Sequence, residues 1–170
     1  QLDQVATTRW LLALRRDHPV LRPATFATGR PVPGDTIADV GWYTRKGAGI
    51  PEGGWAREEN RVFQMLRSGV PHGDRDALVL VNGTFGTHRV SLAEGHGLPW
   101  LVAMDTSWSD PSDGGIDVHR DLGTLPERLE RLDPGASVRL EPLSVLVLLS
   151  AELPGAEVPG AEVPGRDIRE

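Results

Sequence analysis

Four aspartates near one tryptophan are the residues of this chain whose type and spacing come nearest to a hydrolytic site. Cleavage of a glycosidic bond needs one carboxyl group as an acid and a second as a nucleophile or base. Asp105, Asp110, Asp113 and Asp117 flank or follow the end of an expected strand, with Trp108 among them. The same stretch is rich in Ser, Pro and Gly, and such residues favour turns. We therefore predict a solvated loop here and assign no catalytic residue.

The histidines and carboxylates do not have the spacing of a metal site. The patterns H-x-H, H-E-x-x-H and H-x-x-E-H are absent from the sequence. His88, Glu94 and His96 could form a cupin-like site only without the H-x-H pair, so we interpret the histidines as surface or turn residues: His18, His72, His88, His96 and His119. Nucleophile-elbow and phosphate-binding glycine motifs are absent as well. The sequence predicts no metal and no cofactor.

Two tryptophans stand beside glycines or serines and not inside an apolar run. These are Trp55 and Trp108. A loop tryptophan can offer its ring face to a sugar, which makes both residues candidates for substrate binding. The alternative is that each indole folds back and covers the core or an interface, as most large aromatic side chains do. The other tryptophans are expected to be packing residues: Trp10, Trp42 and Trp100.

The elements that must position these residues are one helix and a series of strands. Val5, Trp10, Leu11, Leu12 and Leu14 recur at helical spacing, and Pro19 ends the helix. Such an apolar stripe has no obvious place to be buried, because nothing else nearby is helical. Beyond it the pattern changes to that of strands, expected at Ala24–Thr28, Ile37–Thr44, Arg61–Leu66, Ala77–Val81, His88–Leu92, Trp100–Met104, Val138–Leu140 and Ser144–Leu149.

Two strands are expected to be central. Ala77–Val81 and Ser144–Leu149 are apolar on both alternating faces, which requires cover on each side. Asn82-Gly83 marks the turn of a hairpin from the first of these to His88–Leu92, and Leu125–Leu132 has the spacing of a short helical turn. The sequence predicts a mainly β protein with two packed antiparallel sheets, a β-sandwich, preceded by one α-helix.

Composition narrows the classes of partner. The chain has 170 residues, a size at which one core is expected, and a formal net charge of -6 with no basic cluster, which argues against nucleic acid. No apolar run is long enough to span a membrane, and no signal peptide is recognisable. The absence of cysteine fits the cytoplasm. The repeated Pro-Gly-Ala-Glu-Val units of residues 151–170 predict a flexible tail.

The run Leu11-Leu12-Ala13-Leu14-Arg15-Arg16-Asp17-His18-Pro19-Val20-Leu21-Arg22 resembles the last barrel helix and its exit in bacterial glycogen debranching enzymes of the isoamylase group, in glycoside hydrolase family 13. Later segments follow in the family's order. Asp39-Val40-Gly41-Trp42 resembles its D-[IV]-x-W strand, and Gly54-Trp55 falls at its acidic-Trp turn. Leu78–Gly83 and Leu143–Leu149 resemble later strands, so the resemblance spans most of residues 8–149.

The resemblance implies three segments. Residues 1–22 would be a remnant of the last helix of a (β/α)₈ barrel, 23–150 the C-terminal β-sandwich domain, and 151–170 the tail. The catalytic acids of the family have no counterpart here. The implied function is that of a noncatalytic accessory domain of a glycogen debranching α-1,6-glucosidase, with the barrel of its parent chain as partner and glycogen or maltooligosaccharide as a further candidate. The alternatives are an independent glucan-binding module using Trp55 or Trp108, and a self-contained small hydrolase.

Overall fold

The computed structural model describes residues 2–107 and 131–155. These residues form one α-helix, α1 (Leu2–Asp17), and several short 3₁₀ turns. The strands are β1 (Val40–Thr44), β2 (Val62–Arg67), β3 (Ala77–Asn82), β4 (His88–Ser91), β5 (Trp100–Asp105), β6 (Arg131–Leu132), β7 (Ser137–Leu140) and β8 (Ser144–Ser150). The predicted mainly β class with one preceding helix is confirmed.

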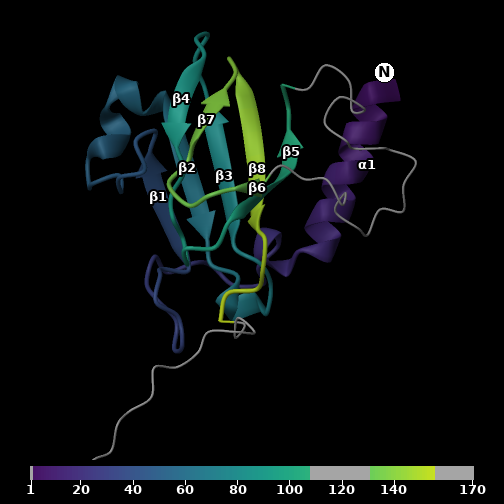
Figure 1. Ribbon diagram of the computed structural model, residues 1–170, viewed down its shortest axis with the longest axis vertical. Helices are drawn as coiled ribbons and strands as arrows, with labels where there is room; N and C mark the ends of the chain where they lie inside the picture. The colour runs from purple at the N-terminus through teal and green to yellow at the C-terminus, as the bar shows by residue number, and fades with distance from the viewer. Residues whose placement is uncertain (1, 108–130, 156–170) are drawn as a thin grey trace, which may run out of the picture.

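The strands form two antiparallel sheets. The larger sheet has six strands in the order β1-β2-β3-β8-β5-β6, and the smaller consists of β4 and β7 (Figure 1). One core cluster contains Leu80 and Leu148 from the large sheet together with Val90 and Leu140 from the small one. The sheets therefore pack face to face as a sandwich. β3 and β8 lie at the centre of the large sheet, as their apolar patterns predicted.

The face of the large sheet that meets β4 and β7 is its inner face. Leu78 and Leu80 on β3, and Leu146 and Leu148 on β8, are at most 4% exposed. Trp100 of β5 is fully buried with them, and its indole N–H donates to the carbonyl of Ala93. Strand alternation sends the intervening valines to the opposite, outer face.

The helix α1 packs on the outer face. Leu14 is buried in a second cluster with Met104, Val147 and Leu149, and the Trp10 indole donates to the carbonyl of Ala103 at 3.2 Å. The helix ends at Asp17 because the next residue, before Pro19, has extended backbone angles. The expectation that this helix has no place on its own chain is thus corrected, since one of its sides is covered by the sheet.

Two other expectations need correction. Residues 24–28 form no strand: the backbone N–H groups of Thr28 and Gly29 donate to the Asp39 carboxylate, and Phe26 is fully exposed. β3 and β4 form no hairpin either, because β3 pairs with β2 and β8 while β4 pairs with β7. Of the predicted helical turn at 125–132, residues 125–130 lie outside the described residues and the last two form β6.

None of the helices in the described part of the chain is both long and apolar enough to cross a bilayer. Residues 156–170, most of the predicted tail, lie outside the described residues. The division into three segments remains a prediction.

Candidate functional site

Trp55 lies in a cluster of three aromatic rings at the β1 edge of the large sheet. Its ring centroid is 5.1 Å from that of Trp42 on β1 and 5.9 Å from that of Phe63 on β2, in edge-to-face arrangements. Trp42 and Phe63 are 6.1 Å apart. Such edge-to-face pairs are favourable beyond their buried area. Trp55 nevertheless remains 53% exposed and Trp42 38% exposed.

A tight turn places Trp55 over the sheet. The residue sits in a 3₁₀ turn, Gly54–Ala56, that follows Gly53 in the left-handed region at φ 77°. Gly54 is packed so closely that a Cβ there would approach Ile50 Cγ2 to 2.8 Å. The Asn60 amide donates to the Gly54 carbonyl at 2.6 Å. Glycines are therefore needed on both steps into the turn that carries the indole.

The aromatic cluster offers a surface without hydrogen-bonding side chains of its own beyond the two indoles. Trp55 is placed where a ring face can meet either a sugar or another protein surface. The second tryptophan candidate, Trp108, lies outside the described residues, as do Asp110, Asp113 and Asp117. Asp105 accepts hydrogen bonds from the N–H and hydroxyl of Ser107, the role of a turn residue.

A second polar site lies at the end of the sandwich where the β2–β3 connection turns. His96 places Nδ1 at 2.6 Å from Asp76 and Nε2 at 2.7 Å from Asp35. Carboxylate oxygens accept hydrogen bonds, so both ring nitrogens donate and the ring is an imidazolium. The side chain of Asp35 is completely buried, that of Asp76 is 1% exposed and that of His96 is 13% exposed. The cationic form of the ring is therefore held between two buried carboxyl groups.

Burial disfavours the charged forms of Asp35 and His96, but the hydrogen bonds that these groups make outweigh the cost of burial. For Asp35, donation from the Ile37 N–H, Ser68 and His96 lowers the pKa despite desolvation. For His96, desolvation is likewise overcome by the two carboxylates, which raise its pKa. Asp76 also accepts from the Gly69 N–H at 2.8 Å. The triad thus joins three separate loops.

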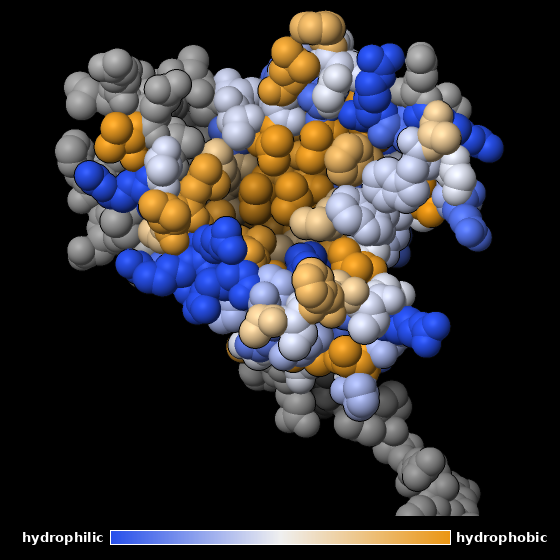
Figure 2. Space-filling model, turned by 180° about the vertical axis from the view of Figure 1, so that it is seen from behind, coloured by the Kyte–Doolittle hydropathy of each residue, from blue (hydrophilic) through white to orange (hydrophobic). Residues whose placement is uncertain are grey.

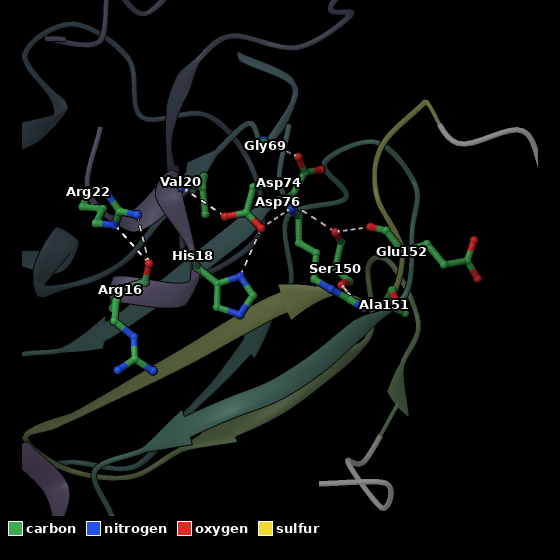
Figure 3. Close-up of polar contacts among 11 residues, drawn as sticks. Arg16, His18, Val20, Arg22, Gly69, Asp74, Asp76, Ser150, Ala151 and Glu152 are labelled. Atoms are coloured by element: carbon green, nitrogen blue, oxygen red, sulfur yellow. Dashed lines mark hydrogen bonds and ion pairs between the residues drawn. The ribbon is translucent and has the colours of Figure 1, made fainter. Parts of the chain in front are cut away.

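A related contact holds the exit of α1. Asp74 accepts from His18 Nδ1 and from the Val20 N–H, each at 3.1 Å, and both groups point at the same carboxylate in Figure 3. Desolvation would raise the pKa of Asp74, yet these bonds and one from the Arg75 N–H lower it. Beside it, the Asp76 N–H donates to Ser150 Oγ. The turn between β2 and β3 is therefore tied to α1 and to β8.

These histidine–carboxylate groups have the geometry of structural ion pairs. Both carboxylates of the triad are committed to His96, and Ser68, the nearest hydroxyl, donates to Asp35 and not to a histidine. Within residues 2–107 and 131–155, no group of three His, Cys, Asp or Glu side chains is arranged so that it could hold a metal ion. His88 on β4 contacts Thr84 at 2.8 Å, whereas His96 lies in the turn between β4 and β5. As interpreted from the sequence, His96 lies in a turn, but its side chain is only 13% exposed and points at two carboxylates.

Sequence reasoning missed Asp35, Asp74 and Asp76. His96 lies 61 residues from Asp35 and 20 from Asp76, so no local spacing connects them. One signal was present: Asp76 directly precedes a strand that is apolar on both faces, and a carboxylate at such a buried position needs a cationic partner.

The fold and sites define an antiparallel β-sandwich domain with an attached helix, and comparison with known proteins adds a relationship. No family model matches the chain. Over 114 residues it is 27% identical to an isoamylase from Flavobacterium sp, a match covering 65% of this chain. The chain spans about 15% of the length of that relative. It therefore contains an isoamylase-related region, in agreement with the group to which the sequence motifs pointed.

Proposed function

We propose that this chain is a noncatalytic accessory domain of a glycoside hydrolase that resembles a glycogen debranching α-1,6-glucosidase. In this proposal α1 belongs to a catalytic barrel in the same polypeptide, and the sandwich supports that barrel. The similarity to an isoamylase of much greater length supports this assignment. The cytoplasm is the expected compartment, as for an enzyme of glycogen breakdown.

The observation that carries the proposal is that α1 is apolar on two sides. Trp10 and Leu14 face the sheet, while Leu12 lies about 200° around the helix from Trp10. Val5, seven residues before Leu12, shares its side. Leu12 is 65% exposed and Val5 56% exposed. A helix with apolar side chains on opposite sides is typical of one packed between two layers.

The test compares the purified chain with the complete product of its gene. The chain alone should release no reducing sugar from glycogen, and the complete product should release it. Leu12→Gln should change the unfolding free energy of the chain alone by less than about 0.5 kcal/mol, since the residue is exposed. In the complete product the same change should lower stability by about 2 kcal/mol. Arg89→Gln on β4 is the matched control and should leave both unchanged.

Two results would overturn the proposal. Release of reducing sugar by the chain alone would make it an enzyme in its own right. If the complete gene product contained no further domain, no catalytic barrel could include α1. The exposed indole of Trp55 favours one alternative, an independent glucan-binding module. Binding of maltohexaose to the chain, measured by titration and lost in Trp55→Ala, would support that module instead.

A further inference from the structure

The outer face of the large sheet carries an apolar surface that α1 only partly covers. Two cross-strand rows form it, and they are Phe63–Val81–Val145 and Met65–Val79–Val147 from β2, β3 and β8. These six residues are the outer patch. All but Val147, which is 8% exposed beside α1, are half-buried. Figure 2 shows apolar side chains gathered in the middle of this face, with hydrophilic ones around its rim.

The outer patch is bounded on two sides. On one side α1 lies over β8 and β5, where Leu14 packs with Val147. On the other side Trp42, which pairs with Met65 in register, and Trp55 rise at the β1 edge. Three strand spacings of about 4.8 Å separate β1 from β8, or about 14 Å. That width matches one α-helix, whose diameter with side chains is about 10 Å.

The chemistry of the outer patch favours a helix over other ligands. None of the six side chains can donate a hydrogen bond, and only the thioether of Met65 is a weak acceptor. A sugar would leave its hydroxyl groups unpaired on such a surface, which is unfavourable. An extended segment would likewise leave backbone groups unpaired, because the patch is a sheet face and not an edge. A helix satisfies its own backbone and can bury an apolar stripe here.

One polar group at the end of the outer patch lacks a partner in the described part of the chain. Arg67, the last residue of β2, shares the outer face and pairs in register with Val40 and Ala77. Its Nε is buried and meets no hydrogen-bond acceptor among the described residues. Buried donors are normally paired. A carboxylate, or the free carbonyls at a helix C-terminus, would satisfy this guanidinium.

We infer that the outer patch is the seat of a second helix, contributed by a neighbouring domain of the same polypeptide and packed beside α1. This inference rests on the proposed function, since it takes its occupant from the additional chain that the much longer isoamylase relative contains. The helix presents an apolar stripe to the patch, and its C-terminal end or an acidic side chain faces Arg67. Trp42 and Trp55 then contact the second helix on the side opposite α1.

The absence of cysteine from the chain allows a direct test. Val81→Cys places a nearly isosteric thiol in the outer patch, and Val79→Cys repeats the measurement in the other row. Leu12→Cys reports on the outer side of α1, and Arg89→Cys on β4 is the exposed control. The rate of reaction with a water-soluble disulfide reagent is measured in the chain alone and in the complete gene product, with each labelled peptide identified by mass spectrometry.

The expected result is at least tenfold slower labelling of Val81→Cys and Val79→Cys in the complete product, with Arg89→Cys unchanged. Equal rates at both patch positions, with Leu12→Cys protected, would overturn this inference and leave the proposed function intact. Equal rates at all positions would overturn both. Protection of the chain alone by maltohexaose, or protection that grows with its own concentration, would assign the patch to a sugar or to a second copy and would also overturn the inference.

Discussion

The two faces of the large sheet differ in completeness. On the inner face, Leu80 and Leu148 are fully buried, and the polar residues among them are paired. The buried Gln64 amide spans the sandwich, donating to the carbonyls of Thr44 and Ser91 and accepting from the Ala93 N–H. On the outer face, Trp42 is 38% exposed and Arg67 Nε has no acceptor among the described residues. The inner face is a closed core, whereas the described residues leave the apolar outer face partly exposed.

The same strands supply both faces, so the difference cannot come from strand propensity. β3 carries Leu78 and Leu80 inward and Val79 and Val81 outward. Both sets are strongly apolar, which is the pattern of a strand covered on both sides. Among the described residues, β4 and β7 cover the inner face of β3, and α1 covers its outer face only in part.

The largest expected effect tests this comparison on neighbouring residues of β3. Leu80→Ala should destabilise the chain by about 4 kcal/mol, because it opens a cavity in a closed core. Val81→Ala, one residue away on the outer face, should cost about 1 kcal/mol, since Val81 is only partly buried. Urea unfolding of the two variants measures both values. Similar losses from the two substitutions would show that the outer face is as complete as the inner one.

The second effect concerns the triad that closes one end of the inner core. His96→Gln should destabilise the chain by about 3 kcal/mol, because it leaves the buried Asp35 and Asp76 carboxylates without a cation. His72→Gln, in the 3₁₀ turn Val70–His72, is the control and should have little effect.

The pH dependence of stability identifies the cause. The pKa of His96 is raised by folding, so its contribution is fully present below the unfolded value of about 6.5 and is lost as pH rises through the folded pKa. The pKa of Asp35 is lowered, so its contribution is present above about 3.9 and is lost as pH falls further. His96→Gln should remove the alkaline decline seen in urea unfolding. An unchanged decline would exclude an imidazolium at this position.

The smallest expected effect lies at the rim of the outer face. Trp55→Ala should lower the stability of the chain by about 1 kcal/mol, because it removes two edge-to-face contacts from a half-exposed ring. Phe85→Ala is a matched control, since Phe85 is 88% exposed, and thermal unfolding compares the two. A loss of stability as large as that caused by Leu80→Ala would show that Trp55 belongs to a closed core.

Much of the fold could be predicted from local patterns, and strand pairing could not. The double-sided apolar runs of β3 and β8 identified the central strands because burial on both faces leaves a continuous signal. The predicted hairpin at Asn82-Gly83 was wrong, because a contact distant in sequence directs the chain after β3. The Asn82 amide donates to the carbonyls of Gly86 and Glu141, so the turn directs the chain to the other sheet. Such a contact joins residues too distant in sequence for any turn motif to record.

The sites show the same limit. Trp55 could be singled out as a loop tryptophan, yet only the fold shows that it leans against Trp42 and Phe63. The His96 triad could not be predicted, since each carboxylate comes from a different loop. The 1–22 segment was expected to be separate from the sandwich, and nothing in its own sequence showed that Leu14 would fit beside Val147.

The contacts of Asp74 have a directional consequence. By holding the His18 ring and the Val20 N–H together, this carboxylate fixes the C-terminal end of α1 against the sandwich. The helix has 16 residues and is about 24 Å long. A domain joined to the N-terminal end of α1 would therefore be held at a fixed distance and orientation relative to the sandwich, as it would not be by a flexible linker.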